Sequence, residues 1–161
     1  MSLSILGIFH TIIGLGAIFV AAYILFKDKQ FGLNGGLNKF YLAATVFTAA
    51  SALGIYKHGE FNGAHGLAVL TILAIVVGIV ASKLTFLGSL KKYIVALCFS
   101  STILFHLLPT ATEILTRFPM DAPMVSSLQA PLLLKTFAVI GVCFVILLGI
   151  QLNWLRKNVT T

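Results

Sequence analysis

The residues best suited to chemistry are histidines that lie inside long apolar segments. His106 is near the end of a run of about twenty mostly apolar residues, and Glu113 follows seven positions later, on the same helical face. His10 and His65 occupy two other apolar segments. An ionisable side chain within a bilayer is costly unless it has a partner, so each of these residues is a candidate for a functional site.

Three kinds of site fit these residue types. A b-type haem needs one or two neutral imidazoles from facing helices, and His106 with His10 or His65 would supply them. A zinc or copper ion needs three ligands, which the three histidines would provide, with Glu113 as a fourth ligand or as a hydrogen-bond partner of one of them. A proton relay needs only His and Glu in a hydrated cleft. The chain has no HExxH, CxxCH or phosphate-binding glycine loop, so all three interpretations stay open.

Each candidate also has an ordinary structural interpretation. A buried imidazole such as His10 or His106 can be satisfied by a neighbouring carbonyl or hydroxyl. His65 begins an apolar segment and can lie among lipid headgroups. Glu113 can form an ion pair with Arg117, four positions further along the same helix. The fourth histidine, His58, precedes a glycine, and we expect it in a solvated turn.

Composition decides the class of protein. Hydrophobic residues make up 59% of the 161 positions and charged residues only 9%, far below the roughly 25% of a soluble domain. The chain is therefore expected to be an all-α integral membrane protein, with residues 1–161 forming a single helical bundle. The net charge of +7 comes from basic residues that flank apolar segments, so it indicates membrane topology and no nucleic-acid partner.

Five transmembrane helices are expected from the apolar segments. They cover about residues 5–26, 40–56, 64–82, 92–115 and 131–154. The first two helical hairpins look like a parallel repeat. Span one leads through Lys27 to LNKFYLA, and span three leads through Lys83 to SLKKYIVA. We therefore expect two repeated hairpins followed by a fifth helix, with a site at the repeat interface.

The distribution of Lys and Arg predicts the orientation. Eight of these residues fall in the loops after spans one and three and in the C-terminal tail, and three fall on the other side. By the positive-inside rule the C-terminus is cytoplasmic and the N-terminus is outside. At about 1.5 Å of helical rise per residue, His10, His65 and His106 then lie in the outer leaflet.

Two segments resemble a known group of proteins. The first begins with the stretch from His10 to Leu15 and continues through a lysine and a glycine-rich turn to Tyr41. The second is FHLLPTATEILTRFP at residues 105–119. Both resemble small uncharacterised bacterial inner-membrane proteins, known only as domains of unknown function. Where that family usually has basic and histidine residues before the tyrosine, this chain has Leu37, Asn38 and Lys39. The resemblance implies a bacterial inner membrane and supplies no activity.

The leading functional hypothesis is a membrane protein that binds haem b or a metal ion through His10, His65 and His106, with a redox role and a quinone as a candidate partner. The alternative is a non-catalytic oligomeric protein, such as a small permease, a channel or an accessory subunit of a larger membrane complex. A hydrolytic enzyme using the His and Glu side chains ranks third, so the sequence leaves open whether the protein is an enzyme.

Overall fold

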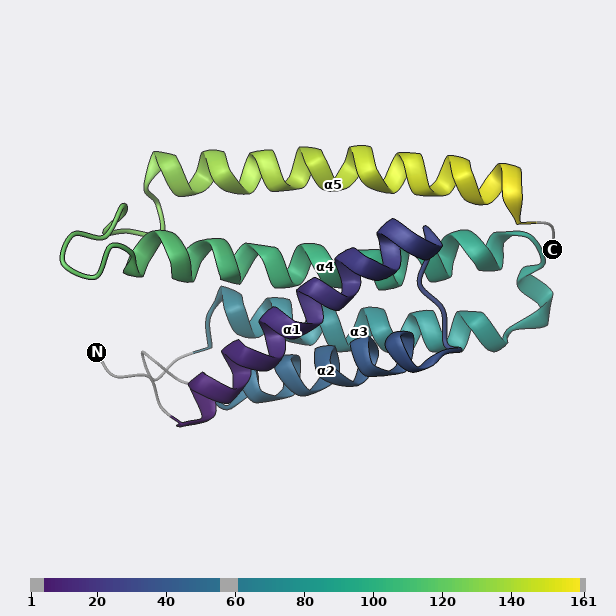
Figure 1. The fold of residues 1–161 in the computed structure, drawn as a ribbon, viewed down its shortest axis with the longest axis horizontal. Coiled ribbons are helices and arrows are strands. Elements are labelled where there is room, and N and C mark those ends of the chain that lie inside the picture. Colours follow the sequence, from purple (N-terminus) through teal and green to yellow (C-terminus); the bar gives the residue numbers. More distant parts are fainter. Residues whose placement is uncertain (1–4, 56–60, 160–161) are drawn as a thin grey trace.

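The structure is a computed structural model that describes residues 5–55 and 61–159. These residues form five α-helices and one short 3-10 helix, which confirms the all-α prediction (Figure 1). The α-helices are α1 (Ile5–Asp28), α2 (Gly36–Leu53), α3 (Gly63–Lys83), α4 (Leu90–Arg117) and α5 (Pro131–Asn158), and the 3-10 helix η1 (Thr85–Leu87) precedes α4.

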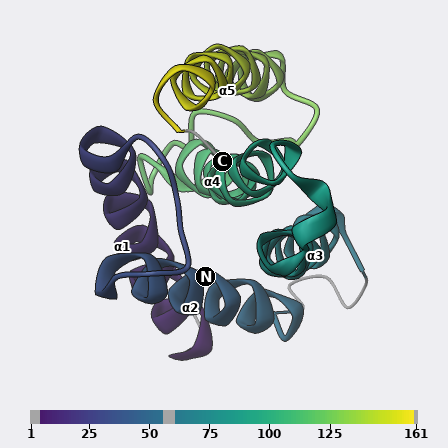
Figure 2. The same ribbon diagram turned by 90° about the vertical axis from the view of Figure 1, so that its right-hand side faces the viewer.

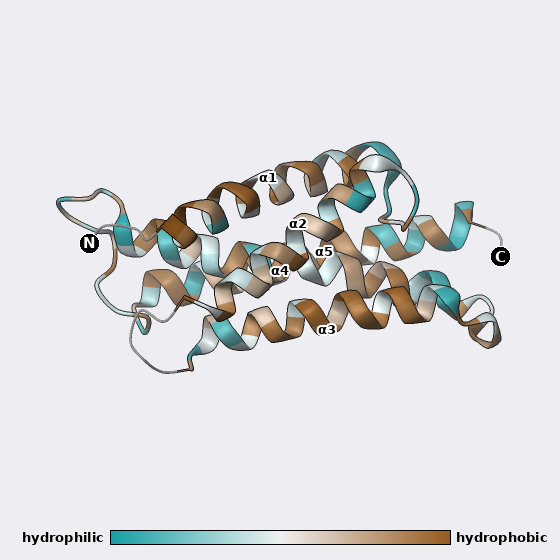
Figure 3. Cartoon of the chain, turned by 90° about the horizontal axis from the view of Figure 1, so that it is seen from below, coloured by the Kyte–Doolittle hydropathy of each residue, from teal (hydrophilic) through white to brown (hydrophobic). Residues whose placement is uncertain are grey.

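Four of the helices, α1, α3, α4 and α5, are long and apolar enough to cross a membrane. Hydrophilic residues gather at the two ends of the bundle, and the length between them is mostly hydrophobic (Figure 3). The protein is therefore a multi-pass membrane protein. The second predicted span, which corresponds to α2, is not one of these four helices. It has 18 residues and buries hydroxyl groups among small apolar side chains.

The helices run alternately up and down, and each packs on its neighbours in the sequence (Figure 1). Seen from one end in Figure 2, α4 lies between α5 and the group formed by α1, α2 and α3. The hydrophobic core lies within this group and α4, around Ile24, Tyr41, Ile75 and Phe99. α5 lies outside it, and only Leu133, Gln151 and Leu155 of that helix are buried.

Small residues allow two pairs of helices to approach closely. A Cβ atom added at Gly14 of α1 would lie 3.2 Å from Cγ2 of Thr48 on α2. One added at Gly78 of α3 would lie 2.5 Å from Cε1 of Phe99 on α4. Gly14 and Gly78 therefore let helices of the same chain pack closely against each other.

Helix boundaries follow from local chemistry. Gly35, with φ of 87°, precedes α2, because the turn needs a residue that tolerates the left-handed region. Pro131 occupies the start of α5, as expected from its missing amide hydrogen. α4 continues as a helix through Pro109. The observed helices begin and end within about four residues of the predicted spans, and Tyr56, the predicted end of span two, lies outside the described residues.

Candidate functional site

Helix α2 holds imidazoles from two other helices. Nδ1 of His10 on α1 lies 3.0 Å from the Ser51 hydroxyl, and Nε2 of His106 on α4 lies 3.4 Å from the Thr45 hydroxyl. The two histidines are also close enough to interact electrostatically. Because α1 begins and α4 ends at the same end of the bundle, both rings lie in that half of the molecule, as the sequence predicted.

The contact of His106 belongs to a buried polar network between α2 and α4. The Tyr41 hydroxyl lies 2.5 Å from Oγ1 of Thr102, and Thr102 donates to the Phe99 carbonyl at 2.6 Å. Thr45 interacts with the Tyr41 hydroxyl as well as with His106. Tyr41, Thr45 and Thr102 are fully buried, so the network is shielded from solvent and lipid. Sequence reasoning gave Tyr41, Thr45 and Thr102 no part in the site, because isolated hydroxyls in apolar helices form no recognisable motif.

His65 has a structural task at the start of α3. Its Nδ1 accepts a hydrogen bond from the backbone amide of Asn62 at 3.2 Å, while the Asn62 side chain accepts from the amides of Ala64 and His65. This is a capping box in which histidine takes the place of the usual Glu or Gln. The His65 ring also stacks on Phe61 and is buried. The signal in the sequence was an asparagine three residues before the histidine.

Glu113 lies near the end of α4 and forms an ion pair with Arg117. Its Oε2 lies 2.5 Å from Nε of Arg117, with the two side chains 47% and 31% exposed. This is the surface pair that the i, i+4 spacing allowed. His58 and Glu60 lie outside the described residues.

The described residues do not bring the candidate ligands into one cluster. In ranges 5–55 and 61–159, no group of three or more His, Cys, Asp or Glu side chains is arranged to hold a metal ion. A zinc or copper site built from His10, His65 and His106 would therefore need these side chains to move together. The pair that the structure does bring together, on the surface of α2, is His10 and His106.

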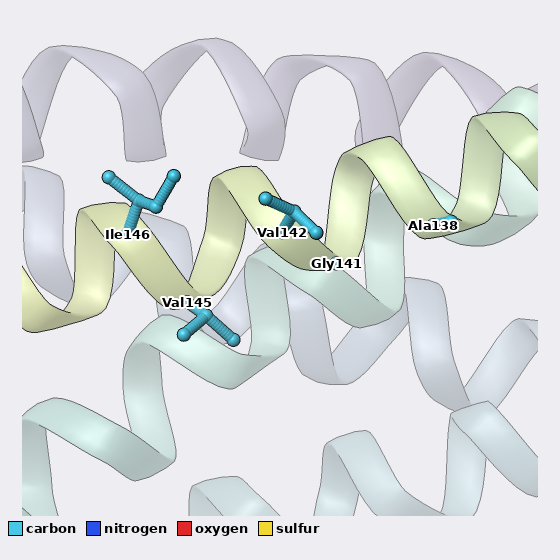
Figure 4. A pocket seen from close by; sticks show the side chains of 5 residues that line it. All are labelled: Ala138, Gly141, Val142, Val145 and Ile146. Atoms are coloured by element: carbon cyan, nitrogen blue, oxygen red, sulfur yellow. The ribbon is translucent and has the colours of Figure 1, made fainter.

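Two open hollows mark the surface away from the histidines. One is apolar and shallow and runs along α5, where Ala138, Gly141 and Val145 form part of its lining (Figure 4). The other is polar and lies in the turn between α1 and α2, with Asp28 and Asn38 among its lining residues. The ring of Phe31, which also lines the second hollow, stacks on Tyr41 at 4.8 Å between centroids.

A glutamine links the outlying helix α5 to the rest of the bundle. Oε1 of Gln151 accepts a hydrogen bond from Ser100 on α4 at 2.7 Å, and its Nε2 donates to the Lys29 carbonyl at 3.0 Å. Sequence reasoning missed this residue, although a polar side chain within the last apolar span was a usable signal. Gln151 therefore ties the C-terminal part of α5 to α4 and to the turn after α1, and Lys92 adds a hydrogen bond to the carbonyl of Val159 directly after the helix.

Comparison with models of known protein families, with curated proteins and with solved structures finds no match to this chain. Functional inference therefore rests on the residues and geometry described above.

Proposed function

We propose that the protein binds haem b in the half of the bundle that contains His10 and His106, and that it serves a redox role in a bacterial inner membrane with a quinone as electron partner. The observation that carries the proposal is the pairing of these two imidazoles on α2. They come from separate helices, α1 and α4, and each is held by a hydroxyl of the same third helix.

Two physical arguments favour haem over the other ligands considered. Ionisable groups are rare at membrane depth and mark functional sites, so two histidines held on one helix need an explanation beyond packing. Haem iron requires only one or two protein imidazoles, whereas a zinc or copper ion requires about three or four protein ligands. Among residues 5–55 and 61–159, no group of three or more His, Cys, Asp or Glu side chains is arranged to hold a metal ion, so the pair of histidines is better matched to haem.

The same proposal includes an orientation, with the C-terminus in the cytoplasm. Eight basic residues lie at the end of the bundle where α1, α3 and α5 finish. They are Lys27, Lys29, Lys39, Lys83, Lys91, Lys92, Arg156 and Lys157. Basic residues are retained on the cytoplasmic side, which would place His10 and His106 in the outer leaflet. A reporter fused to the C-terminus should be active only in the cytoplasm, and the opposite result would reverse this assignment.

The haem proposal is tested on protein purified from membranes in mild detergent. We expect a Soret absorption band and close to one equivalent of iron protoporphyrin IX per chain. The double variant H10A/H106A should lose the band while it remains monodisperse. The matched control is Ser101→Ala, which removes an exposed hydroxyl that bonds only to the Leu97 carbonyl of its own helix. Stoichiometric zinc or copper without a Soret band would overturn the proposal.

The second candidate function, a non-catalytic oligomeric or accessory subunit, is favoured by α5. The middle of this helix packs on α4 along one side and exposes apolar side chains elsewhere, with Val145 66% exposed. Lipid or a neighbouring helix would cover such a surface. The molecular mass of the detergent-solubilised protein separates these cases: a mass above one chain, together with no haem or metal, would support the second candidate over the first.

A further inference from the structure

The charged residues of α4 and α5 mark the thickness of the bilayer around the protein. On α4, twenty residues without Asp, Glu, Lys or Arg separate Lys92 from Glu113. On α5, a stretch of the same length separates Lys135 from Arg156. At about 1.5 Å of rise per residue, the two charges of each pair are about 32 Å apart along the helix, close to the roughly 30 Å of the hydrocarbon layer. The hydrocarbon therefore ends near Glu113 and Lys135.

The loop between α4 and α5, residues 118–130, begins at the level of the lipid headgroups. α4 continues past Glu113 to Arg117, which adds about 6 Å beyond the hydrocarbon. A bilayer of about 40–45 Å in total has about 5–8 Å of headgroup layer on each side. The loop starts at this height and projects past the ends of both helices (Figure 1).

Backbone hydrogen bonds hold this loop against the end of α4. The amide of Val125 donates to the Leu115 carbonyl at 3.1 Å, and the amide of Met124 donates to the Phe118 carbonyl at 3.2 Å. The Val125 side chain is buried. The loop therefore has a defined inner side, and the side chains that remain outside are presented by a folded backbone.

Large apolar side chains lie on the outside of the loop. Met120 is 82% exposed, Leu128 61%, Met124 57% and Phe118 50%. Asp121 is the only charged residue in positions 118–130. An exposed apolar surface of this kind marks a contact with protein or with lipid.

Lipid is the cover that the position of the loop supports. Exposed Ile114 near the end of α4, and exposed Leu132 and Leu134 at the start of α5, connect the loop to the lipid-facing surfaces of both helices. Apolar side chains of interfacial segments enter the boundary between headgroups and acyl chains to about 5–10 Å. The loop begins within that distance of the hydrocarbon, so its apolar side chains reach lipid without any change in the fold.

The charges around the loop balance one another. Glu113 and Asp121 are acidic, and Arg117 and Lys135 are basic. Attraction of basic residues to anionic headgroups therefore gives this region no net pull toward the membrane. Burial of apolar side chains is the remaining driving force.

We propose that residues 118–130 form an interfacial anchor, in which the side chains of Phe118, Met120, Met124 and Leu128 insert among the lipid headgroups of the adjacent leaflet. The proposal depends neither on bound haem nor on which end of the bundle is cytoplasmic. It therefore stands or fails separately from the proposed function.

The first experiment measures the depth of the loop in a bilayer. The background is the full chain with Cys98→Ala and Cys143→Ala. Single cysteines are introduced in separate variants, Met120→Cys, Met124→Cys and Leu128→Cys, and each is labelled with a nitroxide. The labelled proteins are reconstituted in phosphatidylcholine vesicles. Collisions of the label with oxygen, which concentrates in lipid, and with a water-soluble nickel chelate then give its depth.

Two references define the scale of depth. Val145→Cys, at a 66% exposed position in the middle of α5, gives the value for the hydrocarbon, and a free nitroxide in buffer gives the value for water. All three loop labels should fall between the references, within about 10 Å of the hydrocarbon boundary. The depth should not change when anionic phosphatidylglycerol replaces part of the lipid, because the local charges cancel.

Three results would overturn the proposal. Loop labels with the value of the free nitroxide would place the loop in water. Labels protected from both oxygen and nickel would show that protein, such as a second copy of the chain, covers the loop. Insertion that occurs only with anionic lipid would show that charge, and not apolar burial, holds the loop.

The second experiment tests whether the apolar side chains hold the loop in place. With the label at position 128, Met120→Ser and Met124→Ser together should increase collisions with nickel and decrease those with oxygen. The matched control is Ser126→Ala, at an exposed polar position of the same loop, which should leave the depth unchanged. A depth that stays the same in the double serine variant would also overturn the proposal.

Discussion

Replacement of Gly78 by alanine should destabilise the packing of α3 on α4. The added Cβ would lie 2.5 Å from Cε1 and 2.9 Å from Cδ1 of Phe99. The first distance is about 1 Å inside the usual separation of roughly 3.5–4.0 Å between carbon atoms. Phe99 is fully buried in the core beside Tyr41, so its ring cannot turn away without displacing other side chains. The clash must therefore be relieved by moving the two helices apart.

The expected cost follows from two opposing terms. Overpacking of a well-filled core costs about 1–3 kcal/mol. Alanine gains up to about 1 kcal/mol over glycine in a helix interior. With the full gain of alanine, the net effect is a loss of about 0–2 kcal/mol in the free energy of unfolding relative to wild type, and of about 1–3 kcal/mol relative to a helical alanine that meets no clash.

The matched control is Gly66→Ala, on the same helix. A Cβ at Gly66 meets no atom within 4 Å, so this variant should be neutral or slightly stabilised. Both variants are compared by thermal and detergent-induced unfolding. A Gly78→Ala protein as stable as Gly66→Ala would refute the close packing of α3 on α4.

Three further substitutions test other contacts. Tyr41→Phe removes the bond to Thr102 and should cost about 0.5–2 kcal/mol of unfolding free energy, as measured by unfolding in detergent; an unchanged midpoint would count against this network. Gln151→Leu removes the two hydrogen bonds that Gln151 makes to Ser100 and Lys29 and should speed proteolysis near the α5 C-terminus, whereas exposed Asn153→Leu should not; equal rates would contradict the link. Asn62→Ala removes the cap of α3 and should cost about 0.5–2 kcal/mol, so a stability equal to wild type would show that the cap is dispensable.

The position of the candidate site was partly predictable. Spacing placed His10 and His106 at the same end of the bundle, because the rise per residue and the alternation of helix direction are the same for any helical hairpin. The direction in which each ring points was not predictable, since it depends on how the helices are rotated about their axes. That rotation brings His10 to Ser51 and His106 to Thr45. The ion pair of Glu113 with Arg117 needed only local spacing and was one of the alternatives offered for that glutamate.

The sequence by itself determined that the chain is an all-α membrane protein and where most of its helices lie. Long apolar segments must satisfy their backbone groups internally in lipid, so they form helices whatever their neighbours are. The tertiary structure alone decided which polar groups meet. Tyr41 and Thr102 are 61 residues apart, Lys29 and Gln151 are 122 apart, and no local pattern relates them. Such contacts depend on how the side chains of several helices fit together at once, which no single helix determines.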